Sequence, residues 1–517
     1  MSMDLLTPYL NQCQQAGNTP EPGMLSYLAN LQLVSQGSPD IARSTVAELS
    51  DQSRKLKLIA SENYCSLSTQ AAMANPLTDK YCEGIPGARY YAGCENVDEI
   101  ETYAADKAKK LFGADHAYVQ PHSGIDANMV AFLAVLNARV EEPKLRELGA
   151  VTPKGNISMK KASEMSTEDW NKLRHAWGNQ KLLGLSLASG GHLTHGYRPN
   201  VSGKLFESHA YHVDRESNLL DYEAIRKQAK EVRPLILLAG YSAYPRRIDF
   251  KKMREIADEV GAVLMVDMAH FAGLVAGEVF GQPGDDTHPL PHAQIVTSTT
   301  HKTLRGPRGG IVLCAEEFAK YVDKGCPLVL GGPLPHVMAA KAVAFDEALK
   351  PDFKAYAQQI VDNAQALAKE LGDMGCGVIT GGTDNHIVVA DVTPYGVSGV
   401  QAEQALRQAG ITLNRNAIPF DTKSPLVCSG LRIGTAAVTT RGMGTAEMHR
   451  LAELIIEVLK ATEPKDGSEK ECELSEAVAG KVRGEVEQLL ESFPLYPELD
   501  IPMLEKAFDL TPQTAAV

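Results

Sequence analysis

The fold of this chain is decided by residues 296–310, VTSTTHKTLRGPRGG. The β-branched run that ends at Thr300 predicts a short buried strand, and the glycines and proline after it predict a loop. Lys302 follows that strand directly, which is unusual because a lysine is rarely buried without a partner. Beside other cations its amine would have a lowered pKa and become nucleophilic, as a Schiff-base lysine requires. On this stretch alone, a solvated loop lysine is the more favoured interpretation.

Apolar strands alternate with amphipathic helices through the first two thirds of the chain. This alternation predicts an α/β fold with a buried, mostly parallel sheet, since strands covered on both faces are apolar throughout. We expect strands at 116–119, 182–188, 234–240, 262–267 and 295–300, and helices at 97–112, 129–136 and 250–260.

Polar side chains follow these strands. In open α/β sheets ligands bind beyond the carboxyl ends of the strands, and that edge is expected to carry Ser123, His192, Ser242, Asp267 and Lys302. Ser123 opens a predicted helix, where free backbone N–H groups can bind a phosphate. Asp267 ends an apolar strand, so its charge needs a partner; it either caps the next turn or holds a protonated ring nitrogen.

Two segments interrupt the alternation. Residues 77–94, LTDKYCEGIPGARYYAGC, combine tyrosines with glycine and proline, which predicts a ligand-binding loop, although a turn with packed tyrosines is equally compatible. Residues from about 138 to 181 are polar and charged, which predicts a surface insert.

The pattern changes at about residue 345. A long amphipathic helix at 357–371 and strands at 385–391 and 429–435 predict a smaller α+β domain. Arg432 lies within an apolar strand, so we expect it to pair with an anion, either a bound carboxylate or a structural Asp or Glu. The expected division is an N-terminal arm (1–60), a large cofactor-binding domain (61–345), a small domain (346–500) and a tail (501–517), with the last fifteen or so residues frayed.

Composition restricts the classes of function. The net charge of −13 argues against nucleic acid as the main partner. No apolar run approaches membrane-spanning length, and the N-terminus lacks the pattern of a signal peptide. Nine cysteines without a CxxC pair fit reduced thiols, so we expect a cytoplasmic protein away from the membrane. No HExxH motif or zinc-type cysteine–histidine spacing occurs, so no metal is predicted.

Eight longer motifs give the chain a specific resemblance. They are LIASENY at 58–64, KYCEGIPGARYYAGC at 80–94, VQPHSG at 119–124, SGGHLTHG at 189–196, VDMAH at 266–270, THKTLRGPRGG at 300–310, GGTDNH at 381–386 and SGLRIGT at 429–435. Over roughly residues 40–495 the chain resembles the serine hydroxymethyltransferases, pyridoxal-phosphate-dependent transferases of fold type I. The resemblance implies a role in one-carbon metabolism: reversible transfer of the serine hydroxymethyl carbon to tetrahydrofolate, giving glycine and 5,10-methylenetetrahydrofolate.

The resemblance also implies roles for individual residues. Lys302 would bind pyridoxal 5'-phosphate covalently, Asp267 would pair with the pyridinium nitrogen, His192 would stack on the ring, and His270 would lie near the O3′ side. Arg432 would bind the substrate carboxylate. Further expected cofactor-binding residues are Ser123, Gly124, Ser242, Thr299 and His301, and further substrate-binding residues are Ser61, Tyr91 and Leu187.

Other positions concern a second subunit and the folate. Tyr81 and the Gly331-Gly332 turn would reach the cofactor phosphate of a neighbouring subunit, so the resemblance implies a homodimer or a dimer of dimers. Glu83 would handle protons during one-carbon transfer. Asn416 and Ser424 match the folate-binding stretch.

Some positions depart from the family pattern. Ile125 and Asp126 replace a small or hydroxyl residue and a polar amide, and residues 328–330 (LVL) replace a Gly-Gly-Gln run. Both changes remove possible hydrogen bonds at the phosphate site, and Asp126 adds a negative charge. Leu426 replaces an aromatic residue near the folate. The insert and the first 40 residues have no counterpart in the pattern.

Two other functions compete with this interpretation. A folate-independent 3-hydroxy amino acid aldolase or amino acid racemase could use the same scaffold; the intact Glu83, Asn416 and Ser424 favour the folate-dependent reaction over it. A catalytically idle homologue would be expected to lack Lys302, Asp267 or Arg432, and all three are present.

Overall fold

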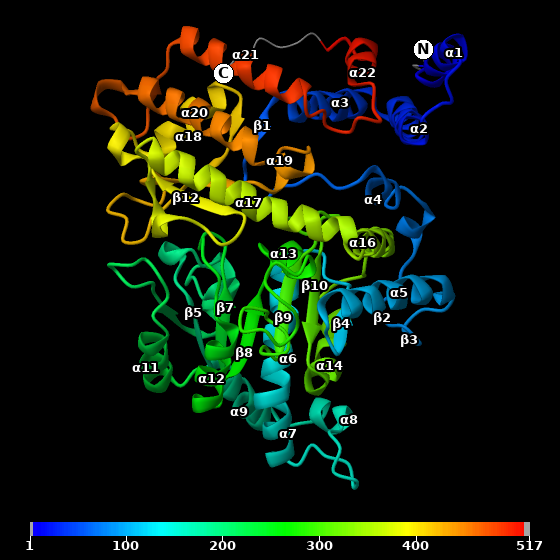
Figure 1. Cartoon of the computed structure of the whole chain (residues 1–517). Helices are drawn as coiled ribbons and strands as arrows, with labels where there is room; N and C mark the ends of the chain where they lie inside the picture. The colour runs from blue at the N-terminus through cyan, green and yellow to red at the C-terminus, as the bar shows by residue number, and fades with distance from the viewer. Residues whose placement is uncertain (1–3, 511–517) are drawn as a thin grey trace.

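A seven-stranded sheet lies at the centre of the computed structural model, which describes residues 4–510 (Figure 1). The strand order is β4-β10-β9-β8-β7-β5-β6; β10 runs antiparallel to its two neighbours, β4 and β9, and the other pairings in this sheet are parallel. The predicted mostly parallel sheet is therefore confirmed. The strands are β4 (His116–Tyr118), β5 (Lys181–Leu185), β6 (Glu207–Tyr211), β7 (Ile236–Gly240), β8 (Val263–Asp267), β9 (Ile295–Thr299) and β10 (Gly310–Cys314).

Helices cover both faces of this sheet, which explains why its strands are apolar throughout. Residues of β7 through β10 are buried without exception. Successive side chains of a strand point to opposite faces; Ile236 and Leu238 belong to one hydrophobic cluster and Leu237 to another. The first cluster contains residues of α6 (Gly124–Leu136) and α14 (Glu316–Val322). The second contains residues of α5 (Glu95–Phe112), α11 (Tyr222–Val232), α12 (Phe250–Val260) and α16 (Pro335–Ala348).

A four-stranded antiparallel sheet forms a second layer above the first (Figure 1). The long helix α17 (Pro351–Asp373) lies between the two, since its Ile360 packs in a cluster of the large sheet and its Leu367 in the cluster of the small one. The small sheet consists of β11 (Gly377–Val378), β12 (Ile387–Asp391), β15 (Gly430–Gly434) and β14 (Asn414–Asn416), with α18 (Gly399–Gln408), α20 (Thr445–Ala461) and α21 (Glu476–Glu491) beside it.

The two ends of the chain pack together. The helices α1 (Leu6–Ala16), α2 (Pro22–Gly37) and α3 (Pro39–Arg54) share a hydrophobic cluster with α22 (Ile501–Ala507). Leu504 is fully buried there, and Glu505 pairs with Arg54 at 2.7 Å. The prediction that the last fifteen residues fray is therefore wrong for α22, because tertiary packing orders a helix too short to be stable alone. The rest of that prediction, residues 511–517, lies outside the described residues.

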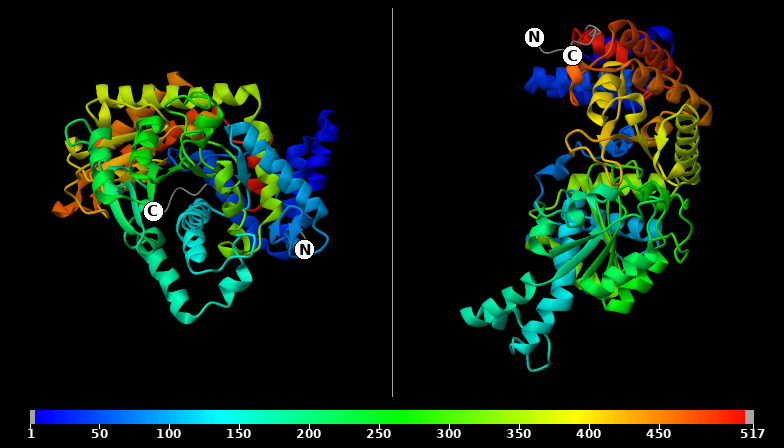
Figure 2. Two further views of the ribbon diagram at one scale, coloured as in Figure 1. Left: turned by 90° about the horizontal axis from the view of Figure 1, so that it is seen from below. Right: turned by 90° about the vertical axis from the view of Figure 1, so that its left-hand side faces the viewer.

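The predicted insert is helical. It contains a π-helical turn (Asn137–Glu141) and the helices α7 (Glu142–Glu147), α8 (Met159–Ser163) and α9 (Thr167–Gly178), and it projects from the rest of the molecule (Figure 2). Leu145, Ala150, Ala162 and Leu173 form a small core of their own. The insert follows the carboxyl end of α6, whose 13 residues span about 20 Å at 1.5 Å per residue. It therefore lies a helix length away from Ser123, which caps the other end of α6.

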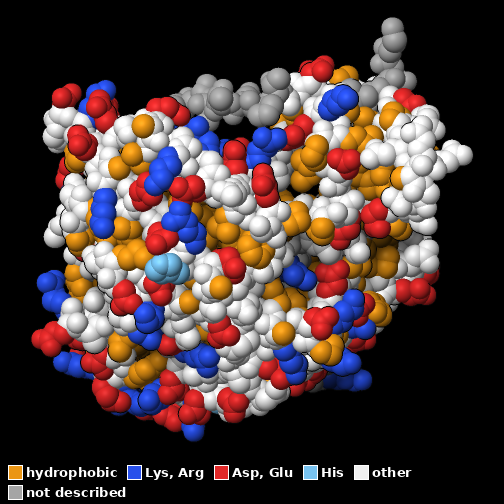
Figure 3. Space-filling model, turned by 45° about the horizontal axis from the view of Figure 1, so that its top comes forward, with side chains coloured by type: hydrophobic (Ala, Val, Ile, Leu, Met, Phe, Trp, Pro, Cys, Tyr) orange, Lys and Arg blue, Asp and Glu red, His pale blue; other side chains and the backbone are white. Residues whose placement is uncertain are grey.

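The surface and the helices agree with the composition. On the face shown in Figure 3, acidic and basic side chains are interspersed, so the net negative charge forms no single patch there. None of the helices within residues 4–510 combines the length and apolarity needed to cross a membrane.

Candidate active site

The predicted polar residues meet at the carboxyl edge of the large sheet. Asp267 is the last residue of β8 and is paired in register with Thr297 of β9 on one side and Gly240 of β7 on the other. Gly240 has a φ of +124°, and a Cβ atom there would lie 2.1 Å from the Asp267 carbonyl oxygen, so only glycine fits. Lys302 follows β9 by three residues. Neighbouring parallel strands thus place the carboxylate and the amine at one edge.

Asp267 is buried and held by three groups. Its Oδ2 atom accepts a hydrogen bond from Nδ2 of Asn128 at 2.9 Å and lies 3.2 Å from Nε2 of His195; its Oδ1 atom accepts from the Ala269 amide at 3.0 Å. Burial acts to raise the pKa of Asp267, but His195, His192 and Asn128 together outweigh it and hold this pKa well below its ordinary value. The carboxylate is therefore ionised and can hold a protonated ring nitrogen.

Two of these partners were missed from the sequence. His195 could have been predicted, because it lies within the SGGHLTHG motif. Asn128 lies outside the quoted motifs, so the sequence gives no sign of its role. The ligand atoms of His192, His195 and Asp267 lie within 4.8 Å of one another, a spacing compatible with a metal ion. Hydrogen bonds already account for the grouping, because His192 Nδ1 also lies 2.7 Å from the Thr194 hydroxyl.

Lys302 is half-buried, and within residues 4–510 its ammonium donates no hydrogen bond and forms no ion pair. Burial lowers the pKa of Lys302 to about 8; Asp267 opposes this shift, and Arg432 and Arg308 add to it. The loop itself is fixed, because the Lys302 carbonyl accepts from Nδ2 of Asn63 at 2.9 Å and from the Arg305 amide at 3.0 Å. The amine is thus free to react while its backbone is held.

The start of α6 fits a phosphate group. The Ser123 hydroxyl caps this helix, accepting from the Asp126 amide at 3.4 Å and donating to the Asp126 carboxylate at 2.9 Å. A Cβ atom at Gly124 would lie 2.7 Å from Cγ2 of Thr299, so the glycine keeps the surface concave. In the described chain, Nε2 of His122 and Nδ1 of His301 are buried without a hydrogen-bond partner. The free backbone N–H groups of a helix N-terminus suit an anion, and the nearby Asp126 carboxylate opposes one.

The two histidines predicted to face the cofactor ring are neutral. Burial lowers the pKa of His192 to about 4. Burial also holds the pKa of His270 well below its ordinary value, with Lys302 and Arg432 adding to the effect. The His270 ring stacks on His386, with centroids 5.5 Å apart and Nδ1 3.3 Å from its neighbour's Nε2. Neutral imidazoles can lie against an aromatic ring without adding charge.

Arg432 brings the small sheet onto the same edge. Its Nε donates to Oδ1 of Asn414 at 3.1 Å, and its Nη1 donates to the Ser242 carbonyl at 2.9 Å. Burial lowers its pKa to about 10, so it stays protonated at neutral pH. No carboxylate of residues 4–510 lies within 4.0 Å of the guanidinium, so the interpretation as a structural Asp or Glu pair is wrong. Three of its five N–H groups remain for a bound carboxylate.

A second group of predicted residues lies on the tyrosine-rich loop. The Tyr81 and Tyr91 rings pack edge to face at 5.1 Å, and a Cβ atom at Gly332 would lie 3.2 Å from Tyr81. Glu83 raises the pKa of Tyr91 by its negative charge. Tyr81 is 55% exposed and Tyr91 47% exposed. Within the described residues, no hydrogen bond or ion pair connects this group with Lys302 or Asp267.

The remaining predicted residues lie between the two sheets or on the surface. Asn416 of β14 shares a small cavity with residues 188–190, which directly follow the exposed Leu187. Ser61 follows Ala60, whose backbone packs directly against Gly434 of β15. A Cβ atom at Gly434 would lie 2.3 Å from the Ala60 Cα atom. Ser424 lies on an exposed turn.

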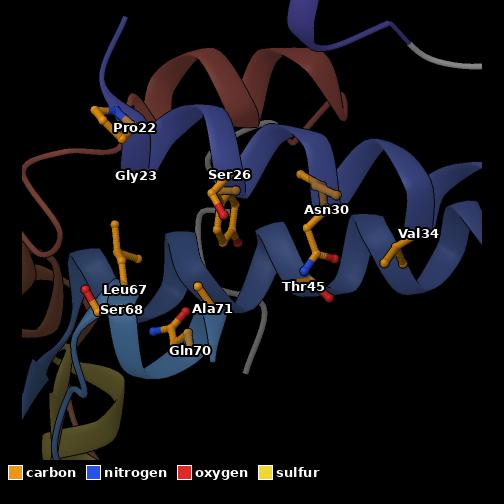
Figure 4. A pocket seen from close by; sticks show the side chains of 12 residues that line it. Pro22, Gly23, Ser26, Asn30, Val34, Thr45, Leu67, Ser68, Gln70 and Ala71 are labelled. Carbon is orange, nitrogen blue, oxygen red and sulfur yellow. The ribbon is translucent and has the colours of Figure 1, made fainter. Parts of the chain in front are cut away.

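A cavity of about 350 Å³ lies elsewhere, among α2, α3 and the short helix α4 (Leu67–Ala71; Figure 4). Its lining contains no Lys, Arg, Asp, Glu, His or Cys, so it offers no charged group and no side-chain base to activate its hydroxyls. The chemistry therefore belongs to the sheet edge. The lining residues are Pro22, Gly23, Ser26, Tyr27, Asn30, Leu31, Val34, Thr45, Leu67, Ser68, Gln70 and Ala71.

A lysine with a lowered pKa, an ionised carboxylate and an anion-binding helix start at one edge of a mostly parallel sheet define a pyridoxal-phosphate enzyme of fold type I. The family model described as serine hydroxymethyltransferase matches residues 34–168 and 156–455. The chain belongs to the serine hydroxymethyltransferase family.

Relatives agree over nearly the whole chain. The serine hydroxymethyltransferase of Treponema pallidum (strain Nichols) is 57% identical, covering 99% of this chain and 88% of its own length. Those of Mycolicibacterium smegmatis and Salinispora tropica are each 55% identical, covering 92% of this chain and 95% and 98% of their own lengths. At 99% coverage the alignment with the Treponema protein extends across the insert and nearly all of the first 40 residues.

These comparisons confirm the predicted family, the fold type, the enzyme class and the use of pyridoxal phosphate and tetrahydrofolate. They also favour the folate-dependent transfer over the aldolase or racemase alternative.

Proposed function

We propose that this chain transfers the hydroxymethyl carbon of serine to tetrahydrofolate, reversibly, at the site built around Lys302 and Asp267. The observation that carries the proposal is the meeting of a reactive amine and an ionised carboxylate at one sheet edge, in a chain 57% identical to a serine hydroxymethyltransferase. Bound pyridoxal phosphate supplies an electron sink for the breaking of the serine Cα–Cβ bond.

The residues around the cofactor ring have distinct tasks. Lys302 attaches the cofactor through its neutral amine, which its lowered pKa makes available. Asp267 keeps a proton on the ring nitrogen, and Asn128 and His195 orient this carboxylate from behind. His192 would lie against the bound ring as a neutral imidazole, and His270 would lie toward its oxygen substituent. Ser123, Gly124, Ser242, Thr299 and His301 complete the cofactor site.

The substrate and folate are bound on the other side of the edge. Arg432 holds the serine carboxylate with its remaining N–H groups, and Ser61 assists from the neighbouring segment. Tyr91 and Leu187 complete the substrate side, and Glu83 moves protons during the transfer. Asn416 and Ser424 bind the folate.

A second subunit completes the site. Tyr81 and the Gly331-Gly332 turn would hold the cofactor phosphate of a partner, which makes the proposed enzyme a homodimer or a dimer of dimers. The exposure of Tyr81 and the absence of hydrogen bonds from it to its own Lys302, within the described residues, support this assignment.

The division of the chain and its location belong to the same proposal. We propose an N-terminal arm (1–60), a large cofactor domain (61–345), a small domain (346–500) and a tail (501–517); the separate clusters of the two sheets support the boundary between the large and the small domain. A cytoplasmic location is supported by nine cysteines that form no disulfide in the described structure.

The absorbance spectrum of the purified protein with glycine, recorded with and without tetrahydrofolate, tests the function. We expect the band of the lysine-bound cofactor to give way to a longer-wavelength band only when folate is present. A band indifferent to folate would favour the aldolase or racemase activity instead. The Lys302→Ala variant, which cannot attach the cofactor, provides the blank.

A further inference from the structure

A second lysine is buried close to the site and has no part in the chemistry above. Lys341 lies on α16, and its side chain is 1% exposed. Its Nζ atom donates to three backbone carbonyl oxygens: Val119 at 2.6 Å, Pro121 at 2.9 Å and Gly310 at 2.9 Å. An ammonium has three N–H groups, so every donor is used.

The surroundings of this ammonium are those of a cation site made of carbonyls. No carboxylate of residues 4–510 lies within 4.0 Å of it. Burial lowers the pKa of Lys341, and the more distant Glu101 and Asp126 oppose that shift. A neutral amine has only two N–H groups and would lose one of these three hydrogen bonds, so the three carbonyls favour the charged form. Converging carbonyl dipoles are also how proteins bind K⁺.

The three carbonyls belong to the two loops that carry the cofactor residues. Val119 and Pro121 directly precede Ser123, and Gly310 ends the loop that starts at Lys302. The Gly310 amide also donates to the Pro121 carbonyl at 2.9 Å. A Cβ atom at Gly309 would lie 2.4 Å from Cε of Lys341, so the loop closes tightly over the side chain.

We propose that Lys341 is a positioning residue that acts as a built-in monovalent cation, joining the Ser123 loop to the Lys302 loop. Removing its side chain exposes a three-carbonyl site that K⁺ or NH₄⁺ can fill. The expected effect on pyridoxal phosphate binding rests on the function proposed above. The expected dependence of the unfolding midpoint on the cation does not.

Three full-length variants test this proposal. Lys341→Ala removes the ammonium and leaves space, and Lys341→Met removes the charge but keeps most of the volume. Lys354→Ala is the matched control, because Lys354 is 54% exposed on the neighbouring α17. Each protein is examined in chlorides of K⁺, NH₄⁺, Na⁺ and tetramethylammonium at equal ionic strength. The two readouts are the midpoint of thermal unfolding and the dissociation constant of pyridoxal phosphate.

The expected pattern separates a cation site from a merely well-packed side chain. Wild type and Lys354→Ala should show the same values in all four salts. Lys341→Ala should unfold at a lower temperature in tetramethylammonium and recover in K⁺ or NH₄⁺, with about tenfold tighter pyridoxal phosphate binding there. Lys341→Met should bind pyridoxal phosphate about tenfold more weakly than wild type in every salt. The Met side chain fills the space that a cation would need and donates no hydrogen bond to the three carbonyls.

Three outcomes would overturn the proposal. One is a Lys341→Ala protein with wild-type values in tetramethylammonium. Another is a weakened Lys341→Ala protein that responds equally to all four salts. The third is a Lys341→Ala chain that refolds neither in K⁺ nor in tetramethylammonium, while Lys354→Ala refolds in both salts. If wild type bound no pyridoxal phosphate, the proposed function would fail, and the unfolding midpoints alone would still decide about the cation.

Discussion

Two lysines stand near the same sheet edge, in different surroundings. Lys302 follows β9 on a fixed loop, and within residues 4–510 its ammonium has no hydrogen-bond acceptor. Lys341 reaches in from α16 and has three acceptors within 2.9 Å. Burial lowers the pKa of both lysines, so burial does not distinguish them. The difference teaches that a buried lysine is available for chemistry only while its donors remain unused.

The charges around the two lysines differ as well. At Lys302, Asp267 opposes the lowering of the pKa while Arg432 and Arg308 add to it; at Lys341, Glu101 and Asp126 both oppose the lowering. Burial outweighs these charges at both sites and brings the pKa of Lys341 to about 7 and that of Lys302 to about 8, so the three acceptors of Lys341, and not its pKa, distinguish it from Lys302. The following predictions test this contrast, beginning with the largest expected effect.

Replacing Lys302 should give the largest loss of turnover of the variants considered. Lys302→Ala should lower turnover by about 10⁴-fold or more, because covalent attachment of the cofactor is lost. With both proteins free of cofactor, its unfolding midpoint should match that of wild type closely, since no hydrogen bond of the side chain disappears. Turnover and thermal unfolding measured on the same samples check both parts. Turnover within tenfold of wild type would show that Lys302 is not the attachment point.

The carboxylate that faces Lys302 should have the next largest effect. Asp267→Asn should lower turnover by about 10²- to 10³-fold, because a neutral amide cannot hold a proton on the ring nitrogen. His195→Gln, which leaves the carboxylate in place, is the milder comparison. Steady-state rates and the cofactor spectrum are the measurements. Equal losses in the two variants would assign Asp267 a purely structural role.

Arg432 tests whether the contrast extends to the substrate. Arg432→Lys should raise the KM for serine by about 10- to 100-fold, because a lysine cannot make the paired hydrogen bonds of a guanidinium to a carboxylate. Attachment of pyridoxal phosphate should be unchanged, which serves as the internal control. An unchanged KM would contradict the assignment of Arg432 to the carboxylate.

The lowered pKa of Lys302 predicts a pH dependence. The neutral amine is the reactive form, so the rate at which added pyridoxal phosphate attaches should rise with pH and level off above about 8. An ordinary lysine would continue to gain rate up to about pH 10.4. Stopped-flow absorbance on the cofactor-free protein measures this rate. A rate that kept rising through pH 10 would mean that the amine is not perturbed.

Asp126 should give the smallest effect. Its carboxylate lies in the first turn of α6, close to the proposed phosphate site. Asp126→Asn should therefore tighten pyridoxal phosphate binding by about two- to fivefold, as expected for removing one negative charge at a helix N-terminus. Titration of the cofactor at low and high salt measures this gain, which should shrink as salt increases. Weaker binding would show that the Ser123–Asp126 hydrogen bond matters more than the charge.

Local patterns were enough to predict much of the fold and part of the site. The strands and the helix at 97–112 follow from the spacing of apolar residues, which is a property of neighbouring positions. The edge position of Asp267 and Lys302 follows from strand direction, because parallel strands end on the same side. The roles of individual residues came from motifs rather than from periodicity.

Other features depend on groups far apart in the chain. Asn128 holds Asp267 across 139 positions, and the ordered α22 depends on packing against α3 at the other end of the chain. For Arg432, the sequence left a structural ion pair and a bound carboxylate open, and only the fold excluded the first.

The sequence by itself determined that a lysine follows a buried strand and that a carboxylate ends the neighbouring one. Only the tertiary structure decided which lysine is free to react. The acceptors of Lys341 lie 222, 220 and 31 positions away, and no local pattern brings three carbonyls to one point. A lysine's reactivity depends on the acceptors and charges that surround it in space, and folding alone assembles those surroundings.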